Sequence, residues 1–306
     1  MKKNKIYLTG HTGLLGSAIY RVLKKKKNIQ ILLTERKNIN LENYKSLEKW
    51  FKKNKPDFVI NAAAKAGGIE DNSKYPVDYM LCNIKIQTNL IDLCHKFKVK
   101  KFIFIGSSCI YPRFSSVPIK ESELLSGELE PTNQWYAITK IQGVKMCEAY
   151  NRQYNSNFSC VMPTNLFGIK DKYDERSHVI PALIKKFHNA KIKKKKYVKV
   201  WGDGKPRREF MYADDCAKII CKILLSKKYF RLINIGTGED ITIKKLAEKI
   251  CKIVGYKGKI KYDKKMPNGV MKKTLEISEI KKLKLNKFIN FELALKKTYK
   301  DFLNRI

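Results

Sequence analysis

The sequence predicts an α/β fold with a doubly wound parallel sheet, and three observations support this. The chain of 306 residues begins with a short apolar strand, Ile6 to Thr9, which runs into a glycine turn and then a segment of helical periodicity. Strand-like and helix-like segments then alternate along the first half of the chain. The continuous apolar run 101–106 is typical of a strand that is buried on both faces of a parallel sheet.

The turn after the first strand predicts a site for a dinucleotide. Glycine permits a tight turn, a close approach of a phosphate to the backbone, and close packing of helix on strand. The helix that follows offers free amides and the positive end of its dipole to an anion. The residues that we expect to contact the dinucleotide here are Gly10, Thr12, Gly13, Leu14, Leu15 and Gly16.

The end of the second predicted strand, Ile29 to Thr34, bears on the choice of cofactor. Glu35 and Arg36 follow it, about 20 residues after Gly16, where an acidic residue binds the ribose hydroxyls of NAD or an arginine binds the extra phosphate of NADP. Arg36 favours NADP(H) and Glu35 opposes it. The alternative is that both are solvated loop charges.

The remaining elements extend this alternation and then depart from it. The small-residue loop Asn61 to Gly68, which includes Ala63, lets a ligand approach a strand end closely. We expect helices at 47–53, 77–97, 179–191, 243–255 and 291–303, and strands at 57–62, 101–105, 158–165 and 197–201, with 210–215 and 232–236 returning to the main sheet.

These elements predict a Rossmann domain and a smaller C-terminal lobe that is discontinuous in sequence. We expect residues 1–165, with returns near 210–237, to form the NADP-binding domain. Residues 166–209 and 238–306 would then form the substrate-binding lobe.

Tyr136 and Lys140 are a candidate acid–base pair. The apolar spacing through Ile141, Val144 and Cys147 predicts a helix, on which residues four apart share a face. An ordinary tyrosine has a pKa of about 10, and a lysine about 4 Å from the phenol would stabilise the phenolate by roughly 4 kcal/mol at an effective dielectric near 20. The alternative is an ordinary surface tyrosine and lysine.

Ser107 and Cys109 follow the strand at 101–105. If the chain stays extended here, their side chains point to the same side and direct a hydroxyl and a thiol at one ligand. The alternative is that Cys109 is a packing residue, as buried cysteines usually are.

The strong positive charge does not identify a partner. The chain carries 65 Lys and Arg against 28 Asp and Glu, a net charge of +37, which would suit nucleic acid or an anionic membrane. However, the lysines are dispersed along the whole chain, and no nucleic-acid-binding motif accompanies them. We expect no nucleic-acid partner and no membrane partner.

Cysteine usage and the N-terminus predict a cytoplasmic protein. The eight cysteines form no Cys-x-x-Cys pair and lie in apolar contexts, as reduced core residues do, and the four histidines have no metal-ligand spacing with them. We therefore expect no metal site. The N-terminus lacks the apolar segment of a signal peptide, and no apolar stretch reaches the roughly 18 residues of a membrane span.

Six motifs in order resemble the GDP-L-fucose synthase family of the extended short-chain dehydrogenase/reductase superfamily. The resemblance runs from the N-terminus to Asp215 and, more weakly, to the end of the chain. The motifs are residues 62–69, 106–112, 130–133 before Tyr136, 150–154, 161–165 and 177–182.

The resemblance implies three reactions at one site: epimerisation of GDP-4-keto-6-deoxy-D-mannose at C3 and at C5, then reduction of its C4 ketone by NADPH to give GDP-L-fucose. Both carbons flank the C4 carbonyl, so Ser107 and Tyr136 would stabilise either enolate at one oxygen. The positive charge of Lys140 would favour the ionised form of Tyr136. Inversion needs a base and an acid, which the resemblance assigns to Cys109 and His178, although His178 taken alone is an ordinary loop histidine.

The resemblance also implies further binding residues. The cofactor would be bound by the glycine turn and Arg36 and by five further residues, namely Ala63, Lys140, Pro163, Asn165 and His178. Residues assigned to the sugar nucleotide are Val179, Lys186, Trp201, Arg208 and Glu276. The chain departs from the family pattern at Thr12, where a basic residue is frequent, and at Glu276, where an aspartate is usual. These departures leave the cofactor preference and one end of the substrate site open.

A homodimer is a further implication, formed through helices 77–97 and 136–150. Two other functions stay open. One is a different nucleotide-sugar epimerase, dehydratase or reductase of the superfamily, which would not need Cys109 and His178. The other is a non-catalytic protein that binds NADP or nucleic acid, against which Ser107, Tyr136 and Lys140 argue.

Overall fold

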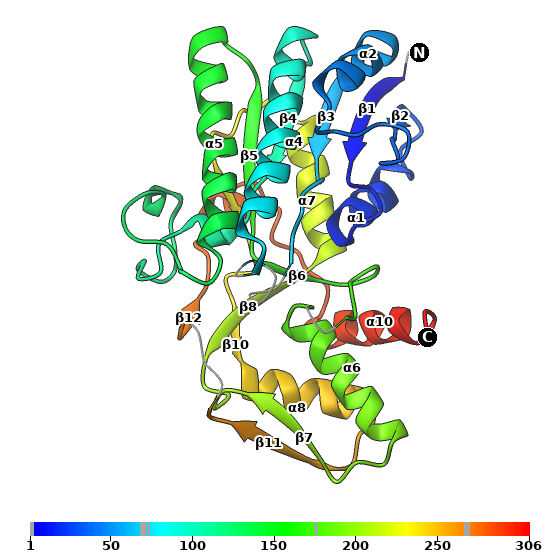
Figure 1. The fold of residues 1–306 in the computed structure, drawn as a ribbon, viewed down its shortest axis with the longest axis vertical. Helices are drawn as coiled ribbons and strands as arrows, with labels where there is room; N and C mark the ends of the chain where they lie inside the picture. Colours follow the sequence, from blue (N-terminus) through cyan, green and yellow to red (C-terminus); the bar gives the residue numbers. More distant parts are fainter. Residues whose placement is uncertain (1–2, 68–71, 73, 175–176, 266–269) are drawn as a thin grey trace.

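A parallel sheet of six strands forms the larger body of the protein, in a computed structural model that describes residues 3–67, 72, 74–174, 177–265 and 270–306 (Figure 1). The strands follow the order β2-β1-β3-β4-β5-β9. They are β1 (Asn4–Thr9), β2 (Ile29–Leu32), β3 (Phe58–Asn61), β4 (Lys101–Ile105), β5 (Phe158–Pro163) and β9 (Ile233–Ile235). The predicted α/β fold with a doubly wound parallel sheet is confirmed.

Helices cover both faces of this sheet, because its central strands are apolar on both sides. Helix α1 packs against α7 on one face, and α4 packs against α5 on the other with α2 beside α4 (Figure 1). These helices are α1 (Leu14–Leu23), α2 (Tyr44–Asn54), α4 (Pro76–Lys96), α5 (Gln134–Tyr154) and α7 (Ala213–Leu225), with the short helices η1 (Ser108–Ile110), η2 (Glu121–Glu123) and α9 (Ser278–Lys282).

The strand order changes direction at β1, which places a crevice at its carboxyl end. Strand β1 pairs with β2 on one side and with β3 on the other. Thr9, at the end of β1, donates a hydrogen bond of 2.9 Å from Oγ1 to Oδ1 of Asn61, at the end of β3. Ligands of doubly wound sheets bind where two such strand ends diverge. The fold therefore directs a ligand to the glycine turn and the loop after Asn61.

A smaller lobe lies beyond the carboxyl ends of these strands (Figure 1). Strand β8 lies at the centre of its sheet, between β10 and β12, and also pairs with β6, while β7 pairs with β11. The elements are β6 (Asn165–Phe167), α6 (Val179–Ile192), β7 (Tyr197–Trp201), β8 (Arg207–Tyr212), β10 (Asp240–Thr242), α8 (Ile243–Val254), β11 (Lys259–Asp263), β12 (Lys272–Lys273) and α10 (Phe291–Leu303).

Most predicted elements are present, but one return to the main sheet is wrong. Segment 232–236 does return, as β9, whereas 210–215 is divided between β8 of the small sheet and the start of α7. Phe210 and Met211 are buried and apolar in either sheet, so local pattern does not distinguish the two. The second strand also ends early, at Leu32. Gly68, the end of the predicted small-residue loop, and Ile69, the end of the first family motif, lie outside the described residues.

Two hydrophobic cores accompany the two sheets. The larger core contains residues of β1, β3, β4 and β5, and the smaller one contains residues of α6, α8 and α10. Leu275, Ile277 and Ile280 belong to the larger core, although the sequence assigned 238–306 to the lobe. The chain therefore crosses between the two bodies more often than predicted, and the functional division at 165 stays a prediction.

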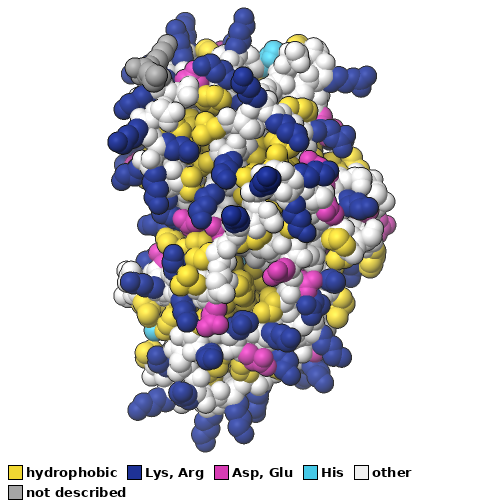
Figure 2. All heavy atoms as spheres, turned by 180° about the vertical axis from the view of Figure 1, so that it is seen from behind, with side chains coloured by type: hydrophobic (Ala, Val, Ile, Leu, Met, Phe, Trp, Pro, Cys, Tyr) yellow, Lys and Arg dark blue, Asp and Glu magenta, His cyan; other side chains and the backbone are white. Residues whose placement is uncertain are grey.

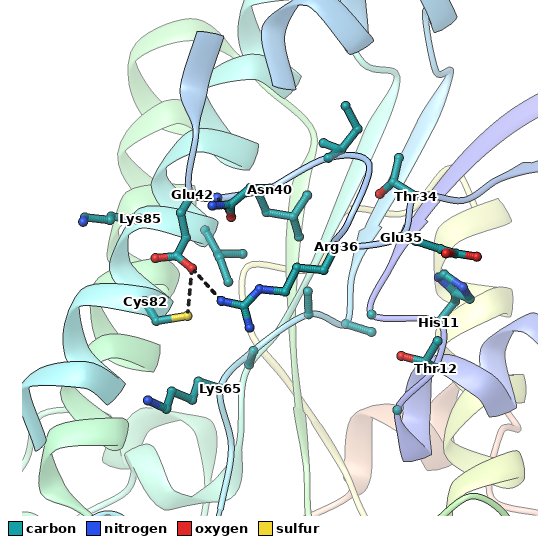
Figure 3. Close-up of a pocket in the computed structure, with 18 of the residues that line it drawn as sticks. His11, Thr12, Thr34, Glu35, Arg36, Asn40, Glu42, Lys65, Cys82 and Lys85 are labelled. Carbon is teal, nitrogen blue, oxygen red and sulfur yellow. Dashed lines mark hydrogen bonds and ion pairs between the residues drawn. The ribbon is translucent and has the colours of Figure 1, made fainter. Parts of the chain in front are cut away.

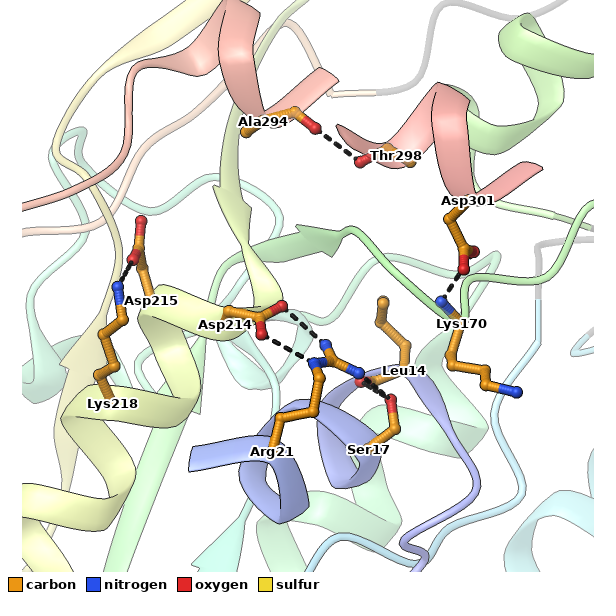
Figure 4. A network of polar contacts seen from close by, with 10 residues as sticks. All are labelled: Leu14, Ser17, Arg21, Lys170, Asp214, Asp215, Lys218, Ala294, Thr298 and Asp301. Carbon is orange, nitrogen blue, oxygen red and sulfur yellow. Dashed lines mark hydrogen bonds and ion pairs between the residues drawn. The ribbon is translucent and has the colours of Figure 1, made fainter. Parts of the chain in front are cut away.

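Polar contacts join elements that are distant in sequence (Figure 4). The Arg21 guanidinium on α1 donates two hydrogen bonds, of 2.9 and 2.7 Å, to the carboxylate of Asp214 on α7. The backbone N–H of Lys170 donates to the carboxylate of Asp301 on α10 at 3.0 Å. A bidentate arginine–carboxylate pair fixes geometry as well as charge. These contacts fix α7 to α1 and α10 to the loop that precedes α6.

The surface carries its positive charge in a dispersed form. Figure 2 shows lysine and arginine side chains over the whole of one face, with acidic side chains among them, and not gathered into one stripe. In the described ranges, no helix is long and apolar enough to cross a membrane. All eight cysteines are free, six of them buried, which agrees with their predicted role as reduced core residues.

Candidate active site

The glycine turn has the shape that a dinucleotide phosphate needs. A Cβ atom on Gly10 would lie 2.5 Å from the carbonyl oxygen of Ala62, and one on Gly16 would lie 2.0 Å from that of Gly10. Helix α1 begins after Gly13 with neither a side-chain cap nor an acidic residue in its first turn. Its first amides and the positive end of its dipole are thus left for an anion. This arrangement fits the predicted dinucleotide.

A cavity of about 960 Å³ opens beside this turn, at the switch point of the sheet (Figure 3). This volume lies at the upper end of the range for small-molecule and cofactor sites. Five predicted cofactor residues line it, namely Gly10, Thr12, Gly13, Arg36 and Ala63. The sequence analysis missed other lining residues: His11, Thr34, Asn40, Glu42, Lys65, Cys82, Lys85 and Lys172.

One side of the cavity, which we name the adenosine wall, carries Glu35, Arg36, Glu42 and Cys82 (Figure 3). Nη2 of Arg36 lies 3.5 Å from Oε1 of Glu42, and the Cys82 thiol donates to the same oxygen at 3.6 Å. Burial and the Glu42 carboxylate raise the pKa of Cys82. Glu35 is paired with Lys37 at 2.9 Å. Both candidate cofactor-selecting residues are present, and each already has a partner.

Ser107 and Cys109 lie together at the carboxyl end of β4, but not on an extended chain. Residues 108–110 form a 3₁₀ turn, and the backbone N–H of Cys109 donates to Oγ of Ser107 at 3.4 Å. The expected strand-like alternation is therefore wrong. A serine hydroxyl that accepts from the amide two residues later favours a turn over an extended strand. The turn nevertheless keeps Ser107 and Cys109 close together, and Ser107 opposes the rise that burial causes in the pKa of Cys109.

Tyr136 and Lys140 lie on α5 as predicted, yet their geometry differs from the prediction. Nζ of Lys140 lies 5.6 Å from the centroid of the Tyr136 ring and donates a hydrogen bond of 2.9 Å to the carbonyl of Ile105. Burial, followed by Cys109, raises the pKa of Tyr136 well above its usual value. The expectation that Lys140 lowers that pKa is wrong here. Burial itself lowers the pKa of Lys140 to about 8.

Cys109 is surrounded by groups that alter its ionisation. Burial raises the pKa of the thiol, while Lys273, the hydrogen bond from Ser107 and Lys140 oppose this rise. Lys273 lies on β12, opposite Arg208 of β8, and burial lowers the pKa of its ammonium. We name Ser107, Cys109, Tyr136, Lys140 and Lys273 the catalytic cluster. It combines one thiol, two hydroxyls and two cations.

His178 is the N-cap of α6, the first helix of the smaller lobe. Burial, followed by the nearby Lys172, lowers the pKa of its imidazole. Lys172 also lines the dinucleotide cavity. Within the described residues, no hydrogen bond joins His178 to Cys109. A base and an acid that serve opposite faces of one carbon need not touch, so this separation is compatible with the predicted pair.

The predicted substrate residues fall into two groups. Val179 begins α6, and Nζ of Lys186, two turns further, lies 5.2 Å from the centroid of the Trp201 indole, which is 59% exposed. Arg208 on β8 is largely buried, which lowers the pKa of its guanidinium while Glu130 opposes this change. Cations near an exposed aromatic surface suit a nucleoside diphosphate.

Glu276 has a local role instead. Its two carboxylate oxygens accept from the backbone N–H and the hydroxyl of Ser278 at the start of α9, both at 2.8 Å. Of the other predicted cofactor residues, Pro163 ends β5, and Asn165 donates from Nδ2 to the carbonyl of Glu209 at 3.0 Å. Leu14, Leu15 and Gly16 form the first turn of α1.

A family model, the NAD dependent epimerase/dehydratase family, matches residues 6–236, which include the glycine turn, Tyr136 and Lys140. The chain belongs to this family. Its Rossmann sheet and the position of Tyr136 and Lys140 on α5 agree with that membership.

Named members of the epimerase/dehydratase family are similar over almost the whole chain. A GDP-L-fucose synthase of Sinorhizobium fredii is 42% identical over 303 residues, 99% of this chain and 96% of that protein. The structure of a C. jejuni GDP-6-OMe-4-keto-L-xylo-heptose reductase matches with a TM-score of 0.92 and 32% identity, over 100% of this chain and 99% of that one. A Naegleria fowleri GDP-L-fucose synthetase bound to NADP has a TM-score of 0.92 and 29% identity, over 100% and 94%.

Lys273 is the member of the catalytic cluster that was not predicted from the sequence. It is one of 65 Lys and Arg in the chain, so its presence in the sequence carries no signal. Its place in the site depends on the pairing of β12 with β8, which lies more than sixty residues earlier. Lys186 and Arg208, by contrast, were predicted because the resemblance to a family extends beyond the six motifs, as far as Asp215.

Proposed function

We propose that the protein is a GDP-L-fucose synthase, which converts GDP-4-keto-6-deoxy-D-mannose to GDP-L-fucose by epimerisation at C3 and C5 and reduction of the C4 ketone. The observation that carries the proposal is the placement of a buried thiol, Cys109, against the Ser107, Tyr136 and Lys140 set of a reductase. A reductase alone needs no such thiol. The relatives named GDP-L-fucose synthase support this assignment.

Ser107 and Tyr136 hold the C4 oxygen throughout the reaction. Because C3 and C5 are both adjacent to C4, loss of a proton from either carbon places negative charge on this oxygen. Two hydroxyl donors at one oxygen stabilise each enolate in turn. The raised pKa of Tyr136 keeps the phenol protonated, so it donates to the enolate and finally protonates the C4 alkoxide. Lys140, held on the Ile105 carbonyl, is the nearby cation that limits the charge on the phenolate left behind.

Cys109 removes the proton and His178 supplies one to the opposite face. Burial favours the neutral thiol and the neutral imidazole in the resting protein. Transfer of one proton from thiol to imidazole, through solvent, gives the reactive thiolate and imidazolium. The raised pKa of Cys109 and the lowered pKa of His178 make this form a minority at every pH. We therefore expect isotope exchange to have a bell-shaped pH profile with its maximum near neutrality.

NADPH fits the glycine turn and supplies the hydride that reduces C4. The pyrophosphate would lie on Gly10, Gly13 and the first amides of α1, and the extra phosphate near Arg36. The NADP bound to the Naegleria relative supports this choice of dinucleotide. Lys140 would reach the nicotinamide ribose.

The substrate lobe holds the nucleotide of the sugar. Lys186 and Arg208 supply charge for the diphosphate, and Trp201 offers an exposed ring for the base or the sugar. Because β8 carries Arg208 and pairs with β12, the lobe also delivers Lys273 to the catalytic cluster. Substrate binding and thiol ionisation thus depend on one small sheet.

Incubation with GDP-4-keto-6-deoxy-D-mannose in heavy water tests the proposal. Without dinucleotide we expect deuterium to enter at C3 and C5, and with NADPH we expect its oxidation and formation of GDP-L-fucose. Absence of both exchange and oxidation contradicts the proposed function.

A second candidate is a reductase of a 4-keto GDP-sugar without epimerisation, favoured by the match to the C. jejuni heptose reductase. It predicts NADPH oxidation without deuterium at C3 or C5. The same incubation therefore separates the two functions.

We also propose a homodimer through α4 and α5. These helices pack together and still leave apolar side chains exposed, with Val77 64% and Leu81 51% exposed on α4 and Ile138 exposed on α5. Such a face suits a two-fold helix bundle. Light scattering at micromolar concentration should give twice the chain mass. Leu81→Lys should halve this mass, and a monomeric parent protein would contradict the proposal.

A further inference from the structure

Glu42 is a carboxylate that nothing in the proposed reaction uses, although it lies in the adenosine wall. It belongs to the loop before α2, and its side chain is 24% exposed. The Cys82 thiol on α4 donates to Oε1 of Glu42 at 3.6 Å. A carboxylate that is held between a loop and a helix keeps its position when neighbouring side chains move.

Arg36, unlike Glu42, is held in place by little besides its pairing with Glu42. Its side chain is 85% exposed, and Nη2 lies 3.5 Å from Oε1 of Glu42, which is an ion-pair distance too long for a strong hydrogen bond. Figure 3 shows its guanidinium pointing towards Glu42 and Cys82, away from His11 and Thr12 of the glycine turn. Exposed pairs of this kind are weak and exchange partners readily.

We infer that Glu42 competes with the 2′-phosphate of the dinucleotide for Arg36 and so sets the preference between NADPH and NADH. The inference rests on the proposed function, because it concerns the dinucleotide that this function uses. The ribose of a bound dinucleotide lies at the end of the second strand, near the glycine turn. To meet a phosphate there, Arg36 must turn away from Glu42.

The competition acts on the phosphorylated cofactor alone. A phosphate monoester carries about −1.5 to −2 charges at neutral pH, whereas NADH has a hydroxyl at the same position. Thr12 adds no cation, and Lys37 and Lys65 are already paired with Glu35 and Asp78, at 2.9 and 3.1 Å. Glu42 therefore disfavours NADPH in two ways: it retains Arg36, and it places a negative charge near the phosphate.

Direct titration of the full chain with each dinucleotide, without sugar, tests the inference. We expect Glu42→Gln to lower the Kd of NADPH about three- to tenfold and to change that of NADH less than about twofold. Glu48→Gln is the matched control, since Glu48 lies on α2, pairs with Lys96 and does not line the cavity. This control should leave both constants unchanged.

A second variant background, Arg36→Met, separates competition for Arg36 from simple repulsion between Glu42 and the 2′-phosphate. In Arg36→Met, the gain in NADPH affinity from Glu42→Gln should fall below about twofold. If Glu42→Gln weakens NADPH binding, Glu42 orients Arg36 and the inference is overturned. Equal gains for NADPH and NADH, or an unchanged ratio, overturn it as well. Because the titrations contain no sugar, failed turnover of GDP-4-keto-6-deoxy-D-mannose would contradict the proposed function and leave this test intact.

Discussion

In the catalytic cluster, Cys109 and Lys140 are buried at the end of β4, whereas in the adenosine wall Arg36 extends into solvent beside Glu42. Burial shifts the pKa of the thiol upward and that of the ammonium downward, because removal from water disfavours both charged forms. Across the adenosine wall, water screens the charge of the exposed Arg36, so this side chain can exchange partners. Charge thus governs reactivity in one region and affinity in the other.

The largest expected effect comes from replacing one cysteine by alanine in each region and comparing the two variants. Cys109→Ala removes the proposed base, so deuterium exchange at C3 and C5 should fall by at least about a thousandfold. Cys82→Ala, the matched control in the adenosine wall, should leave exchange within about twofold. Both variants should still bind NADPH in a direct titration. Normal exchange in Cys109→Ala would remove this thiol from the mechanism and break the comparison.

A smaller effect should come from Lys273→Met. Loss of this cation raises the pKa of Cys109 further, so the thiolate–imidazolium form becomes rarer at neutral pH, and the falling limb of the exchange profile, which the pKa of the thiol sets, moves to higher pH. We expect a shift of about one pH unit and about tenfold slower exchange at pH 7, with the difference from the parent protein disappearing at high pH. Lys272→Met, whose exposed side chain pairs with Asp240 at 3.7 Å, is the control and should not move the limb. An unshifted limb in Lys273→Met would show that the thiol does not sense this cation.

The smallest expected effect is that of salt, which should screen the exposed charges of the adenosine wall more than the buried charges of the catalytic cluster. Raising the salt concentration from about 20 to about 200 mM should lower the ratio of NADPH to NADH affinity about threefold, because exposed charges are screened. The falling limb of the exchange profile should move by less than about 0.3 pH units, since Cys109 and its cations are largely desolvated. Equal salt sensitivity of both measurements would contradict the distinction drawn between the two regions.

Local pattern in the sequence was sufficient to predict the large sheet and many element bounds. Lys101–Ile105, Tyr197–Trp201 and Phe291–Leu303 occur as predicted, because apolar periodicity and flanking turns define a strand or a helix locally. The partner of a strand is not local, which is why β8 was assigned to the wrong sheet. The glycine turn, Arg36 and the Tyr136 and Lys140 helix were predicted from spacing alone.

The electrostatics of the site could not be predicted from the sequence. The expected lowering of the tyrosine pKa assumed a lysine about 4 Å from the phenol at an effective dielectric near 20, whereas the structure buries both side chains and raises the pKa of Tyr136. Lys273 and Glu42 were missed because no local feature marks a charged side chain as part of a site. The cytoplasmic location and the exact domain boundaries stay predictions.

Strand β12, coloured orange in Figure 1, lies beside the green strand β8, and this late pairing has a consequence for the order of synthesis. The glycine turn, Cys109 and Tyr136 leave the ribosome early, but Lys273 follows them after on the order of ten seconds at ordinary elongation rates. A nascent chain can therefore form the dinucleotide site while its thiol still lacks this cation. Epimerisation should become faster once the C-terminal segment docks, so a chain truncated before Lys273 should bind dinucleotide yet exchange deuterium more slowly than the full chain.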